Sequence, residues 1–118
     1  MSRGERTRRV GDQIQRELST LIRNELRDPR VGLVTLTGVK VSPDMAHAWV
    51  YYTCLDPAHV KSAGLGLTHS AGFLRAQLAR RIRLYAIPAL HFAYDASIEQ
   101  GDHLSRLIDS VSGPDKSP

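Results

Sequence analysis

Residues 31–54 read VGLVTLTGVKVSPDMAHAWVYYTC, and this stretch decides the fold. Its two halves, 31–41 and 46–54, are rich in the β-branched and aromatic residues that suit a pleated strand. Between them, Ser42-Pro43-Asp44 combines residue types that initiate turns. The stretch therefore predicts a β-hairpin.

The alternation of the first strand changes phase part-way along. Val34 and Leu36 share one parity. Val39 and Val41 share the other, and Gly38 lies between the two pairs. Because one extra residue in a strand produces such a shift, we predict a β-bulge near Gly38.

The second strand is aromatic on both faces. Trp49 and Tyr51 share one parity and Tyr52 has the other. Aromatic rings on an open sheet face stack nucleotide bases in some RNA-binding modules. A tryptophan in a small sheet is more often a core residue, so we assign Trp49 to the core and keep base stacking as the alternative.

The segment before the hairpin, residues 4–27, predicts a long amphipathic helix. Its apolar residues recur on one face, and they are Val10, Ile14, Leu18, Leu21 and Ile22. The helix should end at Asp28-Pro29-Arg30, because a proline pushes the residue before it out of the helical region.

The segment after the hairpin predicts two helices and a third strand. Residues 57–67 are small and contain glycine, which suggests a short helix, and residues 69–85 predict a stronger one. The apolar stripe of this second helix is Ala71, Leu74, Leu78, Ile82 and Tyr85. Pro88 marks the next boundary, and residues 89–95 alternate as a strand.

The remaining residues predict a short helix and a tail. The helix would carry Leu104, Leu107, Ile108 and Val111, and the polar residues 112–118 read as a disordered tail. Residues 1–111 then form one α+β domain whose three-stranded sheet is covered by helices on one face. The other sheet face is left open to solvent or to a partner.

Arginines form a stripe on the first helix, opposite its apolar face. Arg9, Arg16, Arg23 and Arg27 recur at steps of 7, 7 and 4, and Arg30 follows just beyond the helix. A row of spaced guanidinium groups can follow the phosphates of an RNA backbone. The alternative is a solvated outer face on which Asp12 pairs with a neighbouring arginine.

The helix at 69–85 carries a second basic face. Between residues 74 and 84 there are four arginines and no acid. Arg75, Arg80 and Arg83 should point away from the core and contact RNA, whereas Arg81 lies beside the apolar stripe and is expected to be structural. An ordinary solvated face usually mixes charges, so this segment favours nucleic acid more than the first helix does.

The overall composition agrees with an RNA-binding protein of the cytoplasm. The net charge is +4, and 13 of the 16 basic residues are arginine. No apolar run approaches the roughly 20 residues that a membrane helix needs, and the polar first ten residues predict no secretory signal. The single cysteine, Cys54, has no internal disulfide partner and suits a reducing compartment.

The sequence contains no catalytic or metal-binding motif that we recognise. The five histidines are scattered, and none has a metal-ligand spacing with another ligand. His91 and Asp95 could share one face of the third strand, but exposed strand residues explain that equally well. We therefore expect no enzymatic activity, and keep a protein-interaction module and an RNA-modifying enzyme as alternatives.

The chain also lacks the Gly-x-x-Gly loop with which KH domains clamp a nucleotide backbone. Where that loop would lie, between the second and third helices, stands Ser70-Ala71-Gly72. This tripeptide predicts a kinked junction between the helices. Binding should then depend on charge and shape more than on reading single-stranded sequence.

From about Arg8 to Leu107 the chain resembles one family, ribosome-binding factor A. Five blocks in order carry the resemblance: Arg9-Val10 with Ile14-Gln15-Arg16-Glu17-Leu18; Asp28-Pro29-Arg30-Val31-Gly32 with Val34-Thr35-Leu36-Thr37; Val41-Ser42-Pro43-Asp44 with Ala48, Val50 and Tyr51; Gly72-Phe73-Leu74-Arg75; and Pro88-Ala89-Leu90-His91-Phe92 with Asp95. Each block alone is weak, but five at matching intervals are specific.

The resemblance implies a type-II KH-like domain, α-β-β-α-α-β, in which an Ala-x-Gly kink replaces the Gly-x-x-Gly loop. Ser70 stands here where the family usually has alanine. Tyr85 and Ala89 stand where it often has arginine and glutamate, so the basic surface beside the third strand could be weaker.

The resemblance also implies a role. A monomeric, non-catalytic protein would bind the free 30S ribosomal subunit and its 16S rRNA, without cofactor, metal or membrane. It would promote late 30S maturation, 5′-end processing of 16S rRNA and growth in the cold, and a maturation GTPase would help to release it.

Overall fold

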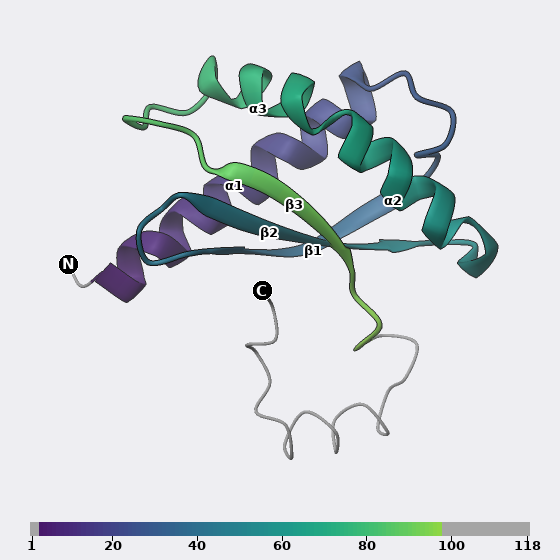
Figure 1. Cartoon of the computed structure of the whole chain (residues 1–118), viewed down its shortest axis with the longest axis horizontal. Coiled ribbons are helices and arrows are strands. Elements are labelled where there is room, and N and C mark those ends of the chain that lie inside the picture. The colour runs from purple at the N-terminus through teal and green to yellow at the C-terminus, as the bar shows by residue number, and fades with distance from the viewer. Residues whose placement is uncertain (1–2, 98–118) are drawn as a thin grey trace.

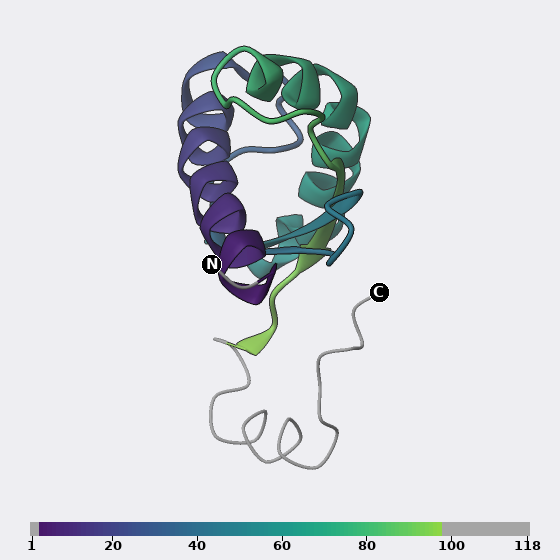
Figure 2. The ribbon, with the colours of Figure 1, turned by 90° about the vertical axis from the view of Figure 1, so that its left-hand side faces the viewer.

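The structure is a computed structural model, and it describes residues 3–97. Three strands form one sheet, and all the helices lie on one side of it (Figure 1). The elements are α1 (Arg3–Glu25), β1 (Val34–Val41), β2 (His47–Cys54), the 3-10 turn η1 (Pro57–His59), α2 (Val60–His69), α3 (Ala71–Ala79) and β3 (Ala89–Tyr94). In the side view, α1 runs along one side of the molecule and the kinked pair α2 and α3 along the other (Figure 2). The predicted α-β-β-α-α-β order is confirmed.

The central strand of the sheet is β2. It pairs antiparallel with β1 and parallel with β3, so the order across the sheet is β1-β2-β3. The predicted turn at Ser42-Pro43-Asp44 closes the hairpin, and Met45 completes it with a positive φ of 65°. The Asp44 carboxylate stabilises this turn by accepting from Ser42 Oγ at 2.7 Å and from the Ala46 N–H at 3.0 Å.

The predicted bulge lies between Leu36 and Gly38, where the register of β1 against β2 shifts by one residue. Thr37 is the extra residue, and its hydroxyl donates to Asp95 Oδ2 at 2.6 Å. The Leu36 carbonyl accepts from the side-chain amide of Gln15 in α1 at 3.1 Å. Polar groups around the interrupted ladder therefore have partners, which is what a buried or half-buried backbone requires.

The core lies between the helices and the inner face of the sheet. All five predicted apolar residues of α1 are buried, from Val10 to Ile22. They pack against inner-face residues such as Val50, which is fully buried. Gly11 brings α1 very close to β1, since a Cβ built there would lie 2.7 Å from the Val39 carbonyl oxygen.

The second helical segment bends at Ser70, as the sequence predicted. Ser70 has φ −92° and ψ 2°, and it ends α2 while it begins α3. Its N–H donates to the Gly66 and Leu67 carbonyls of α2, and its own carbonyl accepts from the Leu74 N–H of α3 at 2.9 Å. A helix kink therefore takes the place of a Gly-x-x-Gly loop.

The helix predicted at 69–85 is too long, because α3 ends at Ala79. The N–H groups of Arg80 and Arg81 bond three residues back, to Gln77 and Leu78, and this tightens the last turn. The chain then turns back toward the sheet so that both Ile82 and Ile87 are buried. Tyr85, which the helical pattern placed in the core, is fully exposed on this return segment.

Two further expectations concern the sheet face and the chain end. Trp49 is not a core residue: it pairs with Lys40 and His91 on the face away from the helices, and it is half-buried there. The helix with Leu104, Leu107, Ile108 and Val111, the tail at 112–118 and the domain boundary at 111 lie outside the described residues.

Candidate RNA-binding surface

The outer face of α1 presents its arginines to solvent. Arg9, Arg16 and Arg23 are exposed, opposite the buried residues of the same helix. Within residues 3–97 no ion pair or hydrogen bond holds the guanidinium groups of Arg16 and Arg23. Both remain available to an external anion.

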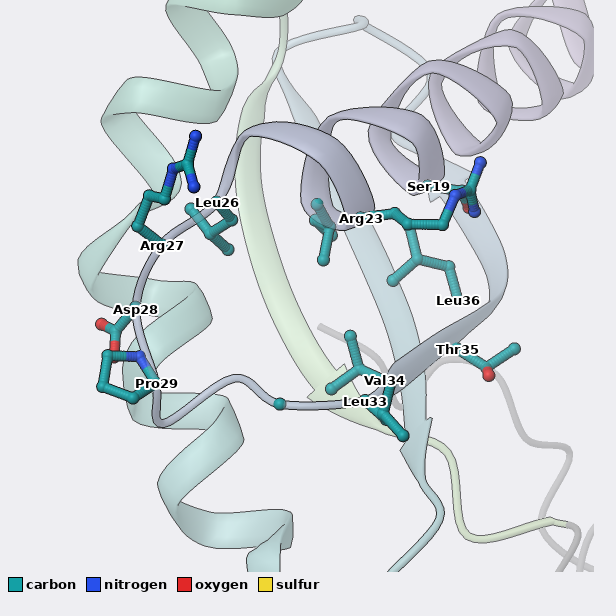
Figure 3. Close-up of a pocket in the computed structure, with 12 residues that line it drawn as sticks. Ser19, Arg23, Leu26, Arg27, Asp28, Pro29, Leu33, Val34, Thr35 and Leu36 are labelled. Atoms are coloured by element: carbon teal, nitrogen blue, oxygen red, sulfur yellow. The ribbon is translucent and has the colours of Figure 1, made fainter.

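The end of α1 differs from expectation, because the helix stops at Glu25 and Arg27 lies in the loop that follows. Arg23 and Arg27 border a hollow of about 460 Å³ between α1 and the start of β1. Figure 3 shows Arg23 leaving the helix near Ser19, while Arg27 leaves the loop beside Leu26. The sequence did not predict this hollow, because it forms only where the loop after α1 turns back to begin β1.

Arg30 is held by a neighbour rather than presented freely. Its Nη2 lies 2.7 Å from Asp28 Oδ2 and its Nε lies 3.0 Å from Asp28 Oδ1. The Arg30 backbone N–H also donates to this carboxylate, at 2.9 Å. These hydrogen bonds hold the pKa of Asp28 at about 2, well below its usual 3.8. The guanidinium group of Arg30 is therefore already bound to the carboxylate of Asp28, two residues earlier in the chain.

Arg75 also serves the fold. Its Nε and Nη2 both donate to the Ile87 carbonyl, at 2.9 and 2.7 Å. This bond ties α3 to the segment that leads into β3. Arg75 is exposed, as the sequence predicted, and its contact with RNA stays a prediction. Helical periodicity did not reveal the chain that folds back against the helix and accepts two of its donors.

Arg80 and Arg83 lie beyond the end of α3, not on its face, and both are exposed. No hydrogen bond or ion pair in the described part of the chain holds their guanidinium groups. Arg81, expected to be structural, bonds to Glu17 of α1 at 3.2 Å. That bond places the two arginine-bearing regions next to each other in the helical layer.

The kink residues play unequal parts. Ser70 is buried and carries the backbone bonds of the junction, whereas Ala71 is half-buried. Gly72 is exposed, and a Cβ built there would meet nothing within 4 Å. Close packing therefore does not explain Gly72, and its backbone faces open space at the start of α3.

Reactive side chains offer little chemistry. Burial raises the pKa of the half-buried Cys54 thiol, and the charge of Asp56 adds to the effect, so the thiol stays protonated at neutral pH. Asp95 lies just beyond β3, which carries His91, and its carboxylate accepts from Thr37 and from the Ser97 N–H. Among residues 3–97, no group of three or more His, Cys, Asp or Glu side chains could hold a metal ion. No helix in the same part of the chain is long and apolar enough to cross a membrane.

The sequence model of one family, ribosome-binding factor A, matches residues 6–108. The ribosome-binding factor A of Nitrosospira multiformis is 57% identical over 116 residues, covering 95% of this chain and 90% of its own length. The chain belongs to the ribosome-binding factor A family.

Solved structures of the ribosome-binding factor A family share this fold. The crystal structure from Thermus thermophilus is 31% identical with a TM-score of 0.69, and the match covers 75% of this chain and 93% of that one. A homology model of the Thermus thermophilus ribosome-binding factor A, fitted into an electron cryomicroscopy map of a complex with 30S, matches with a TM-score of 0.63. That match is 31% identical and covers 73% of this chain and 91% of the other. The type-II KH-like arrangement expected of a ribosome-binding factor A is thereby established for this chain.

Proposed function

We propose that this chain is a ribosome assembly factor that binds the free 30S subunit through its 16S rRNA and takes part in late 30S maturation without catalysing a reaction. The observation that carries the proposal is a group of exposed arginines without protein partners in residues 3–97. This group, the arginine surface, consists of Arg16, Arg23, Arg27, Arg80 and Arg83. Arg9 extends the row on α1.

Two further observations support an RNA ligand. Guanidinium groups suit phosphate because their planar fork of donors matches its oxygens. A relative with the same fold has been placed in a map of a complex with the 30S subunit. The kink at Ser70 leaves the chain without a nucleotide clamp, so the arginine surface would grip folded rRNA by charge and shape.

The proposal includes the finer role that family membership suggests. Binding would accompany 5′-end processing of 16S rRNA and growth in the cold, and a maturation GTPase would release the monomeric factor. A strain depleted of this protein should then accumulate unprocessed 16S rRNA, more so at low temperature. Normal processing of 16S rRNA in the depleted strain would contradict this finer role, but it would not contradict the proposed binding to 30S.

Sedimentation of the tagged chain with purified 30S, 50S and 70S particles tests the binding itself. We expect co-sedimentation with 30S only, and an affinity that falls steeply as salt rises. Each phosphate contact contributes roughly 0.9 to the slope of log affinity against log salt. A nearly flat salt dependence would instead indicate an apolar interface with a ribosomal protein.

A matched pair of charge reversals locates the contact. Arg23→Glu alters the arginine surface, whereas Lys61→Glu makes the same change in charge at an exposed residue of α2. We expect Arg23→Glu alone to weaken 30S binding and to lower the salt slope. Equal losses from the two variants would show that net charge matters and that the arginine surface does not.

A further inference from the structure

Three aromatic rings gather on the sheet face that the helices leave uncovered. His47 and Trp49 come from β2, and His91 comes from the neighbouring β3. The ring centroids of His47 and His91 are 5.0 Å apart, and those of Trp49 and His91 are 5.5 Å apart. His47 and Trp49 complete the set with centroids at 5.8 Å. The arginine surface lies in the helical layer, so this is a separate feature.

The rings contact one another in two ways. His47 Nδ1 and His91 Nε2 are 2.9 Å apart, which is a hydrogen bond between ring nitrogens. Such a bond lies close to the ring planes, so the two imidazoles meet edge to edge rather than face to face. Trp49 and His91 instead stack, with an interplanar angle of 27°. Both histidines are exposed and Trp49 is half-buried, so the three rings form one aromatic cluster on the open face.

Tyr51 extends this surface along β2. It lies two residues after Trp49 on the same face, roughly 7 Å further along the strand. Its neighbours in register are Gly38 on β1 and Ala93 on β3, which are too small to cover the sides of its ring. We call Trp49, Tyr51, His47 and His91 the aromatic platform.

One exposed cation beside the platform can contact a phosphate. Lys40 lies next to Trp49 in the register, at the edge of the sheet. The carboxylates of Asp44, in the hairpin turn, and of Asp95, just beyond β3, accept hydrogen bonds from the protein: Asp44 from Ser42 and Ala46, and Asp95 from Thr37 and Ser97. The large exposed apolar side chains lie off the strands and would be the usual anchors of a protein interface: Leu33, Leu55, Leu65, Phe73 and Tyr85.

We propose that the aromatic platform binds a single-stranded RNA segment by stacking its bases on Trp49 and Tyr51, with Lys40 contacting the phosphate between them. Stacking on an aromatic ring tolerates every base, because each base has an aromatic face. The chain would then bind RNA on two faces. The arginine surface would contact folded rRNA, and the platform on the open sheet face would bind unpaired nucleotides. This second contact goes beyond the proposed function and does not depend on the same residues.

Trp49 is the only tryptophan in the chain, so its fluorescence reports directly on the platform. The experiment titrates the full chain with a single-stranded RNA of ten nucleotides and, separately, with a duplex of equal phosphate count. We expect the single strand to quench and saturate the tryptophan signal, and the duplex to leave it nearly unchanged. Equal quenching by both would show that charge attracts the RNA without stacking, and would overturn the proposal.

Variants separate the platform from the rest of the surface. Tyr51→Ala should weaken single-strand binding roughly five- to 150-fold, the range expected for loss of one stacked base. Tyr85→Ala removes a fully exposed tyrosine away from the sheet and should change nothing. Trp49→Phe keeps a ring and should retain binding of a dye-labelled strand that Trp49→Ala loses. Circular dichroism confirms that each variant is folded.

Two outcomes would reject the platform while leaving the proposed function in place. In the first, the chain sediments with 30S particles but single-stranded RNA leaves Trp49 fluorescence unchanged. In the second, the fluorescence changes with protein concentration in the absence of RNA, which would assign this face to a second copy of the chain. If single-stranded RNA quenches Trp49 but the chain does not bind 30S particles, the proposed function is rejected and the platform is kept.

Discussion

The helix α1 and the segment 71–88 are both rich in arginine, yet they use it differently. On α1 the arginines follow the outer face of a regular helix, and Arg16 and Arg23 have no partner among the described residues. In the second segment, Arg75 bonds the Ile87 carbonyl and Arg81 bonds Glu17. Only Arg80 and Arg83 remain available there.

The difference follows from what each segment has to connect. α1 runs across the sheet with its outer face exposed within residues 3–97. The second segment must end its helix, return to the sheet and bury Ile82 and Ile87, and the part-buried Ile87 carbonyl then needs a donor. Arginine supplies such donors at long reach. A basic stretch that precedes a chain reversal therefore predicts fewer RNA contacts than the number of its arginines suggests.

The largest expected effect compares the two regions directly. Arg16→Glu with Arg23→Glu should weaken 30S binding by roughly 3–6 kcal/mol, since each hydrogen bond to a charged group contributes about 1.5–3 kcal/mol. Arg80→Glu with Arg83→Glu should have a smaller effect, because the two side chains lie beyond the helix and not in a row. Quantitative co-sedimentation at one salt concentration ranks the pairs. A larger loss from the second pair would reverse our ranking.

The next effect concerns folding stability. Arg75→Ala removes both donors to the Ile87 carbonyl and should lower the free energy of unfolding by about 1–2 kcal/mol. Arg83→Ala, eight residues further along, should change it by less than about 0.5 kcal/mol. Urea denaturation of both variants provides the test. Equal stabilities would mean that Arg75 is as dispensable to the fold as a surface arginine.

A smaller effect is expected where the two regions meet. Glu17 and Arg81 form a half-exposed ion pair at 3.2 Å between α1 and the end of α3. Exposed pairs of this kind couple by roughly 0.2–1 kcal/mol. A double-mutant cycle with Glu17→Gln and Arg81→Gln should give a coupling in that range, reduced by added salt. Zero coupling would leave Arg81 as available to RNA as Arg80.

The smallest effect lies in the loop after α1 and depends on pH. Asp28 has a pKa of about 2 in the folded chain against a usual 3.8, so its contribution to stability is present above pH 3.8 and is lost as the pH falls toward 2. Asp28→Asn should therefore unfold at a lower temperature than the unmodified chain near neutral pH. The gap should close between pH 4 and pH 2 in thermal denaturation. A gap that persists at pH 2 would mean that the Asp28 charge is not its source.

Local patterns in the sequence predicted most of the fold. The spacing of apolar residues located the buried face of α1, and the change of parity around Gly38 located the bulge. The end of α3 escaped prediction, because residues 80–85 keep helical spacing while tertiary burial of Ile82 and Ile87 draws the chain back. Tyr85 was therefore misplaced.

Within the candidate surface, the sequence correctly predicted that the arginines of α1 and Arg80 and Arg83 are exposed. The roles of Arg30 and Arg75 depend on partners, a carboxylate in one case and a backbone carbonyl twelve residues away in the other. The aromatic platform needs the pairing of β2 with β3, which no periodicity reveals. The side of the sheet on which Trp49 lies could have been read from Val50 and Tyr52, the aliphatic and aromatic residues that alternate with it.

The parallel pairing of β3 with β2 has a consequence for the kinetics of folding. β1 and β2 meet across a short turn, whereas His47 and Ala89 pair only after the whole segment that contains α2 and α3 has closed into a loop. Loop-closure entropy makes such distant contacts slow to form. We therefore expect the hairpin to form early and β3 to dock last, which brings His91 beside Trp49 in the final step. The fluorescence of the single tryptophan should then report when the sheet is complete.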